Sequence, residues 1–244
     1  MEADQREVWP GWLATSERCL YVPGEETVVV ADLHLGYEGV LRLEGVAMPR
    51  YQGDRIMQGL QRILDRYQPR RVVVNGDFKH EFGKNLQMEW REVGAALDFL
   101  SRRTEVVLVR GNHDNFLKTI AARFGVPVVE EHRMGEVTIA HGHRPVAGEG
   151  RVLLAHEHPV VRLRDEVGAL LTLPCFLYDR EVAVMPAFSP LASGTDVSTA
   201  EREDLLSPLL RSRGLDSLRV VAVSGLGLLD FSTVAGLRRA SRRS

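Results

Sequence analysis

The feature that most limits how this chain can fold is a set of five apolar runs that each end in side chains of metal-binding types. Each run is short and rich in Val, Leu or Ile, which is typical of a strand buried on both faces. Ligands of an open α/β sheet bind just beyond the carboxyl ends of its strands, so these side chains are expected to converge. They are Asp32 and His34 after TVVVA, Asp77 after VVVNG, Asn112 and His113 after VVLVRG, His141 after VTIA, and His156 and His158 after VLLA.

The first half of the chain alternates strand patterns with helix patterns. Apolar residues at helical spacing predict a helix from near Pro49 to Tyr67, another around Trp90 to Leu100, and a short one to about Phe124. Strands separated by helices imply parallel pairing with right-handed crossovers. The predicted strands are TVVVADLHLG (27–36), RVVVNGD (71–77) and EVVLVRGNHD (105–114).

Beyond residue 125 the patterns change to short strands with tight connections, which favours a more antiparallel sheet. The predicted strands lie in 136–143, 151–159, 181–188, 218–224 and 226–231, with a helix around Ala200 to Arg211. Two sheets packed face to face and flanked by helices fit the whole pattern. We therefore predict one α/β domain over residues 1–244. The arginine-rich tail (237–244) is expected to be a disordered, solvated end, with a phosphate-binding arm as the alternative.

The spacing of the polar side chains indicates a metal site. Asp32 and His34 are two residues apart, as are His156 and His158, so each pair projects to one side of an extended backbone. The set without His113 holds seven candidate ligands, which exceeds one tetrahedral ion and suits two ions that share a carboxylate, about 3.5–4 Å apart. Asp, Asn and imidazole suit Mn²⁺, Zn²⁺ or Fe²⁺, and Mn²⁺ is our first choice.

Composition and sequence patterns limit the cellular compartment and the partners of this protein. Cys19 and Cys175 lie in apolar runs far apart, which argues against a disulfide and favours a reducing cytoplasm. The sequence has no signal-peptide pattern and no apolar run of the roughly 20 residues that span a bilayer. A net charge of −2 neither requires nor excludes a nucleic-acid partner.

The ordered motifs resemble those of the calcineurin-like metallophosphoesterase family. The blocks ADLHLG (31–36), NGD (75–77), GNHD (111–114), AHGH (140–143) and AHEH (155–158) follow the order of that family. DLHLG, GDFKHEFG (76–83) and PAFSPLASGTD (186–196) are similar to a smaller branch. That branch holds archaeal proteins related to the SbcD repair nuclease and bacterial ligase-associated DNA-damage-response endonucleases.

The resemblance implies a four-layer α/β/β/α sandwich and a role for each matched residue. One ion would be held by Asp32, His34 and His158, the other by Asn112, His141 and His156, and Asp77 would bridge both. His113 would act at the leaving group, oriented by Asp114. The family usually has Gly before the His-x-His pair, and Ala155 stands there in this chain. We expect this small replacement to require only a local backbone adjustment.

Several neighbouring residues keep alternative interpretations at this point. His143 competes with His141 as a ligand, but His141 directly ends its strand, so His143 is assigned to the pocket. His80 and Glu81 are open between contacts near the site and a role at a helix start. Arg144 is open between a phosphate contact and a solvated loop charge.

The resemblance implies a phosphodiesterase that acts on a nucleic acid or a nucleotide through attack by a hydroxide bridging two cations. The substrate would be a phosphate ester, DNA and RNA included, and family nucleases allow a homodimer. The same metal core also serves phosphomonoesterases and cyclic-nucleotide phosphodiesterases, which are the alternative. A non-catalytic scaffold is the third hypothesis, and the presence of all seven candidate ligands and His113 argues against it.

Overall fold

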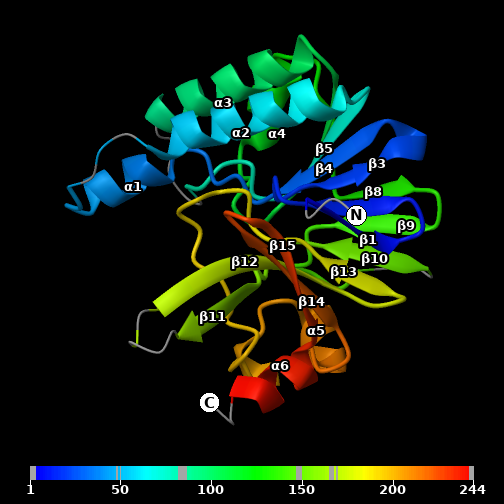
Figure 1. The fold of residues 1–244 in the computed structure, drawn as a ribbon. Coiled ribbons are helices and arrows are strands. Elements are labelled where there is room, and N and C mark those ends of the chain that lie inside the picture. Colours follow the sequence, from blue (N-terminus) through cyan, green and yellow to red (C-terminus); the bar gives the residue numbers. More distant parts are fainter. Residues whose placement is uncertain are drawn as a thin grey trace.

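Two sheets packed face to face form the centre of the computed structural model (Figure 1), which describes residues 4–241 except 48, 50, 82–86, 147–149, 165–167 and 169. The first sheet has seven strands in the order of the sequence. They are β1 (Gln5–Trp9), β2 (Trp12–Thr15), β3 (Leu20–Val22), β4 (Thr27–Ala31), β5 (Arg71–Asn75), β6 (Glu105–Val109) and β7 (Val128–Val129). β1 to β4 pair antiparallel, and β4 to β7 pair parallel.

The second sheet has eight strands in the order β15-β14-β12-β13-β10-β9-β8, with β11 paired to β12. Its centre is parallel, because β10 pairs in parallel with both β9 and β13, and its other pairings are antiparallel. The strands are β8 (Glu131–Met134), β9 (Val137–Ala140), β10 (Arg151–Leu154), β11 (Val160–Arg164), β12 (Leu170–Tyr178), β13 (Val182–Val184), β14 (Arg219–Ser224) and β15 (Gly227–Thr233).

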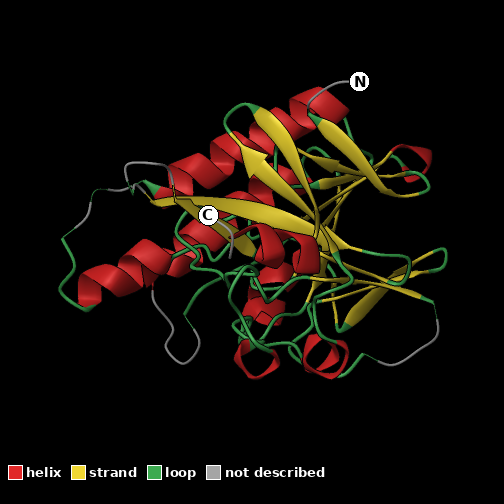
Figure 2. Ribbon diagram, turned by 60° about the horizontal axis from the view of Figure 1, so that its bottom comes forward, coloured by secondary structure: helices red, strands yellow, loops and turns green. Residues whose placement is uncertain are grey.

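Helices cover the outer face of each sheet, so the molecule has four layers (Figures 1 and 2). The first sheet is covered by α1 (Tyr37–Leu43), α2 (Gln52–Tyr67), α3 (Gln87–Ser101) and α4 (Leu117–Ala122). The second carries η2 (Arg202–Asp204), α5 (Pro208–Arg213) and α6 (Val234–Ser241), while η1 (Pro23–Glu25) joins β3 to β4. Three apolar clusters fill the spaces between the layers. The predicted α/β sandwich of two mixed sheets flanked by helices is therefore confirmed.

One polar side chain ties the two sheets together inside the apolar layer between them. Asn75 ends β5 and is fully buried, and its amide donates to the carbonyl oxygens of Ala140 on β9 and Leu153 beside it on β10, at 3.2 and 3.4 Å. Backbone carbonyls at strand ends need such donors when water is excluded. The contact aligns the carboxyl end of β5 with the carboxyl ends of β9 and β10.

The structure differs from the sequence-based expectations in two helical segments. The helix expected over Ala200 to Arg211 is divided into η2 and α5, because Pro208 disfavours helical backbone at Ser207 and starts a new helix itself. The tail expected to be disordered is helical as far as Ser241 and buries Leu237; residues 242–244 lie outside the described residues.

Several elements were not expected from the sequence. The strands β1 to β3, β7, β8, β11 and β12 and the helices α1 and α6 had no prediction, and α2 begins at Gln52 rather than near Pro49. Cys19 and Cys175 are buried free thiols, as expected. No helix among the described residues is long and apolar enough to cross a membrane.

Candidate metal centre

The polar side chains singled out in the sequence meet where the carboxyl ends of parallel strands from both sheets face each other. The structure groups their potential ligand atoms into two adjoining clusters. The first contains Asp32, His34, Asp77 and His158, and the second contains Asp77, His141 and His156. Within each cluster the ligand atoms lie within 4.8 Å of one another. Asp77 belongs to both, which is the arrangement expected of a carboxylate between two ions.

The distances inside the clusters place the ligand atoms in direct contact. Nε2 of His141 lies 3.3 Å from a carboxylate oxygen of Asp77 and 3.1 Å from the side-chain oxygen of Asn112. Nε2 of His158 lies 3.3 Å from Asp32 and 3.3 Å from Nε2 of His34. Asn112 thereby joins the second cluster through His141, so all seven candidate ligands are brought together.

Two buried polar atoms in this centre make no hydrogen bond within the part of the chain that the structure describes. Oδ1 of Asp32 and Nδ1 of His141 face each other at 3.5 Å, and neither has a hydrogen-bond partner there. A buried polar atom without a partner costs about 1–3 kcal/mol, so such atoms call for a ligand. Carboxylate, amide and imidazole donors around unpartnered atoms fit divalent metal ions, and the residues present therefore suit the predicted centre.

The backbone around the ligands is held in an unusual conformation. Asp32, His34, Asp77, His156 and His158 all have left-handed backbone angles, with φ between 39° and 66°. Non-glycine residues seldom adopt this region, and such strain collects at functional sites where the surrounding structure compensates for it. These turns bring alternate residues to the site, because Leu33 packs in an apolar cluster and Glu157 bonds Thr195 on the other side.

Glycine is required at position 76, where the loop after β5 meets an imidazole of the other sheet. Gly76 precedes Asp77, and a Cβ atom built on it would lie 1.9 Å from Nδ1 of His141. Its φ of +81° is also the left-handed conformation that glycine tolerates. The first residue of the Gly-Asp motif therefore leaves room for an imidazole that comes from the other sheet.

Burial and charge divide the imidazoles into two groups. Burial lowers the pKa of His34 to about 2, and burial together with His141 lowers that of His156 to about 3. Burial opposes protonation of His158 as well, but the Asp32 carboxylate outweighs it and raises this pKa to about 9. In the same way Asp77 raises the pKa of His141 against its burial. His158 and His141, each beside a carboxylate, are thus the imidazoles at which a bound cation would compete with a proton.

His113 and Asp114 stand at the edge of the same centre. The backbone N–H of His113 donates to Asp77 at 2.9 Å, and its Nε2 lies 4.0 Å from the other oxygen of that carboxylate. Asp114 accepts hydrogen bonds from the backbone N–H groups of Gly111 and Lys79, at 2.7 and 3.3 Å. Burial and the Asp77 charge raise the pKa of Asp114 to about 7. Through these contacts Asp114 shapes the loop that carries His113.

The residues whose interpretation was open fall in different places. His80 makes a third cluster with His34 and His113. His143 is in neither of the two main clusters, although its ring centre lies 5.2 Å from that of His141. Burial and the neighbouring His141 lower the pKa of His143 to about 4. Arg144 is exposed and pairs with Glu130 at 3.4 Å. His143 and Arg144 line a small open hollow of about 150 Å³ beside His141.

Sequence analysis did not identify the residues that fix the backbone of the ligand loops. Glu157, between His156 and His158, is buried and accepts hydrogen bonds from Thr195 Oγ1 at 2.6 Å and from the backbone N–H of Leu206 and Ser207. The amide of Gln52 donates to the carbonyl of His34 at 2.9 Å and to Ser189. One signal for Glu157 was available in the sequence. It is a charged residue between two histidines, and in an extended backbone it would face away from the site.

Comparison with known proteins is consistent with this geometry. A profile of the calcineurin-like phosphoesterase family matches residues 26–184. The crystal structure of Pseudomonas putida nuclease MPE superimposes with a TM-score of 0.70 at 24% identity and covers 93% of this chain and 99% of that one. A phosphoesterase from E. coli, Yfce, gives a TM-score of 0.41 at 14% identity over 69% of this chain and 83% of its own. No curated protein matched.

Proposed function

The chain belongs to the calcineurin-like phosphoesterase family and is a metal-dependent phosphoester hydrolase, and from this premise we propose that it is a phosphodiesterase with a dinuclear metal centre. Its substrate in this proposal is a nucleic acid or a nucleotide. Mn²⁺ is the proposed metal, because oxygen ligands from Asp and Asn stand beside imidazoles and no thiolate takes part.

The observation that carries the proposal is the pair of ligand clusters that share Asp77. Asp32, His34 and His158 would hold one ion, and Asn112, His141 and His156 the other. Divalent ions in such a pair polarise the phosphoryl oxygens and lower the pKa of water toward neutrality. Asp77, negatively charged against its burial because His141 and His34 surround it, would balance the charge of both.

The residues of the chain supply positioning and proton transfer. His113 is assigned the leaving-group side, since its backbone is fixed on Asp77 while Nε2 points toward the shared carboxylate. A protonated Nε2 at this place donates to the leaving oxygen as the P–O bond breaks. Asp114 keeps the loop in shape and does so through backbone N–H groups.

One finding supports a diester over a monoester. The neighbour of this fold with the TM-score of 0.70 is named a nuclease, and this name motivates the choice of nucleic acid as the first substrate to test. The hollow next to His141 does not decide between the two esters, because Glu130 and Glu131 line it together with Arg144, and Arg144 pairs with Glu130.

The test compares bis-p-nitrophenyl phosphate with p-nitrophenyl phosphate in the presence of Mn²⁺, with metal content measured on the same samples. We expect preferential diester hydrolysis, two bound ions per chain, and loss of both in Asp77→Asn. His113→Ala should lose turnover but keep the metals. Single-stranded and duplex DNA and RNA oligonucleotides follow. Preference for the monoester would establish the alternative phosphomonoesterase. Two bound ions without hydrolysis of any ester would establish a scaffold.

A further inference from the structure

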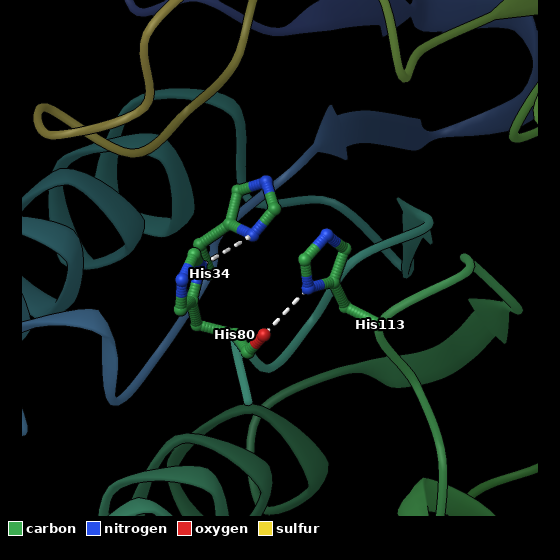
Figure 3. Close-up of side chains that lie close together, drawn as sticks. All are labelled: His34, His80 and His113. Atoms are coloured by element: carbon green, nitrogen blue, oxygen red, sulfur yellow. Dashed lines mark hydrogen bonds between the residues drawn. The ribbon is translucent and has the colours of Figure 1, made fainter. Parts of the chain in front are cut away.

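Three aromatic rings from separate segments stack beside the metal centre. Tyr37, the first residue of α1, lies on His80 with ring centres 3.7 Å apart and planes at 17°. His80, in the loop after β5, stacks in turn on His113, with centres 5.2 Å apart and planes at 26°. Figure 3 shows the two histidines of this stack together with His34. His80, which has no assigned role, therefore lies between His113, the proposed proton donor, and the first residue of α1.

His80 also contacts His113 through its backbone. Nδ1 of His113 lies 2.5 Å from the carbonyl oxygen of His80, which is the lower dashed line of Figure 3. A carbonyl oxygen only accepts, so Nδ1 of His113 must carry a hydrogen. The other ring nitrogen, Nε2, is then the one that takes up and releases the proton exchanged with substrate. The hydrogen bond made by one nitrogen thus sets the task of the other.

The backbone of His80 is itself fixed from both sides by a buried ion pair. Lys79 and Glu89 are each 1% exposed, and Lys79 Nζ lies 3.4 Å from Glu89 Oε2. Glu89 accepts hydrogen bonds from the N–H groups of His80 and Glu81, at 3.1 and 2.6 Å. Lys79 donates to the carbonyl oxygen of Glu81. The pair therefore holds the peptide group that contains the His80 carbonyl, through the N–H of Glu81, and the peptide groups before and after it.

A buried ion pair of this kind is poorly explained by stability alone. Removing both charges from water costs about as much as their attraction returns, and a well-packed apolar pair often stabilises a fold more. The chain nevertheless keeps the pair under the loop that carries His80. Gly36 makes room for it, because a Cβ atom on this residue would lie 2.8 Å from Cβ of Glu89. The N-terminus of α1, with Tyr37, and the start of α3, with Glu89, thus meet around His80.

We propose that Tyr37 and the Lys79–Glu89 pair are positioning residues that hold His80 so that its carbonyl oxygen orients His113 for proton donation. This inference rests on the proposed role of His113. In the reaction, oxygen from water forms the new bond to phosphorus as the water loses a proton to solvent, the bond from phosphorus to the leaving oxygen breaks, and Nε2 of His113 gives its proton to the leaving oxygen. Solvent then returns a proton to Nε2.

The proposal makes a specific demand on the leaving group. p-Nitrophenolate departs as a stable anion and needs little help from an acid, whereas a more basic oxide needs the proton. Loss of His113 orientation should therefore harm poor leaving groups more than good ones. A purely structural defect lowers the amount of active protein and affects all leaving groups equally.

The experiment measures kcat/KM for bis-p-nitrophenyl phosphate and for diphenyl phosphate with the Mn²⁺-loaded full chain. We expect His113→Ala to lose roughly 10²-fold more activity on diphenyl phosphate than on the nitrophenyl ester. Tyr37→Ala and Glu89→Gln should show the same selectivity at about tenfold, in the range of partners that orient a catalytic group. Tyr37→Phe keeps the ring and should behave as the unaltered protein. Tyr51→Ala, which removes an exposed ring lying under Arg55, is the control.

The outcomes separate the two proposals. If His113→Ala lowers both rates equally, His113 is not the acid and the proposed function fails at this residue. If His113→Ala is selective while Tyr37→Ala and Glu89→Gln lower both rates equally or not at all, the positioning inference is overturned and the proposed function stands. Metal content and thermal unfolding are recorded for each variant. Should Glu89→Gln fail to fold, Tyr37→Ala decides the question together with its rescue by Tyr37→Phe.

Discussion

The two sheets contribute different kinds of ligand to the candidate metal centre. Loops of the first sheet supply both carboxylates, Asp32 and Asp77, and the amide of Asn112, with His34 as the single imidazole. Loops of the second sheet supply three imidazoles and no carboxylate: His141, His156 and His158. The negative charge that would balance the proposed cations thus lies on one sheet, and the imidazole nitrogens come mainly from the other.

This division means that the centre exists only when the two sheets are packed. Each cluster contains residues from both sheets, and its cross-sheet contacts, His141 to Asp77 and His158 to Asp32, are both 3.3 Å long. The first sheet alone would keep its carboxylates close together without nitrogen ligands. Residues 26–184, which match the family profile, span the strands that carry all seven candidate ligands.

The largest effect is expected from the carboxylate that both clusters share. Asp77→Asn removes the negative charge between the two sets of ligands, and we expect a loss of roughly 10³-fold or more in kcat/KM together with loss of bound metal. Hydrolysis of bis-p-nitrophenyl phosphate and metal analysis measure both. Asp65→Asn changes an exposed carboxylate on α2 that accepts a hydrogen bond from Gln61, and it serves as the control. Full activity in Asp77→Asn would refute a shared carboxylate.

One imidazole from each sheet tests whether the clusters are separate. His34→Ala affects the first cluster and His156→Ala the second, so each variant should keep one tightly bound ion of two. We expect a fall of about 10²-fold in activity for both, at the upper end for altered metal ligation. Metal titration followed by calorimetry gives the stoichiometry. His132→Ala, on β8 and outside the clusters, should retain both ions. Loss of both ions in either variant would mean a single cooperative centre.

Glu157 fixes the loop of His156 and His158, and it can be replaced without changing a ligand. Glu157→Ala leaves the N–H groups of Leu206 and Ser207 without their acceptor, and the buried one, on Ser207, costs about 1–3 kcal/mol. We expect a lower Tm and about tenfold lower activity, because His156 and His158 lose the residue that fixes their turn. Glu181→Ala, at an exposed carboxylate, is the matched control for thermal unfolding. An unchanged Tm would show that water replaces the lost acceptor.

The last expected effect changes no residue; it concerns pH and follows from the pKa of His158. The pKa of His158 is about 9 beside Asp32, against an ordinary value of 6.5, so the protonated pair stabilises the metal-free fold fully below about pH 6.5. That contribution disappears as pH rises through about 9. Metal binding must displace the same proton, so Mn²⁺ affinity should rise by up to about tenfold per pH unit between pH 6.5 and 8.5.

Two measurements check this pair of trends. Thermal unfolding with a chelator should show falling stability toward pH 9, and anaerobic Mn²⁺ titrations should show rising affinity over the same interval. His158→Gln removes the imidazole and should flatten the stability trend. If metal affinity does not depend on pH, protons and metal ions do not compete for His158. The result would also weaken the contrast between the sheet that supplies carboxylates and the sheet that supplies imidazoles.

Much of the site could be predicted because it follows a local rule. A buried parallel strand is a continuous apolar run, and the residues after its carboxyl end face the site. Asp32, Asp77 and His141 each follow such a run, so their convergence could be expected from the sequence. The helix over 200–211 could not be placed correctly by the same means, since its division depends on the turn before Pro208.

The residues that support the site were not accessible to such a rule. Glu157 reaches Leu206 and Ser207, about fifty positions along the chain, and Asn75 reaches the other sheet. Lys79 and Glu89 look in the sequence like ordinary surface charges, but both are buried. Partners that are distant in sequence leave no periodic signal, because their meeting depends on how the layers pack.

The sequence by itself thus determined the α/β class, the parallel strands and the identity of the polar residues at their ends. The order of apolar runs and ligand types carries that information because strand burial and strand polarity are local properties. Only the tertiary structure decided that Asn75 ties the two sheets together, that Lys79 and Glu89 are buried, and that His80 contacts His113. Those facts depend on how distant segments of the chain pack, which no segment specifies alone.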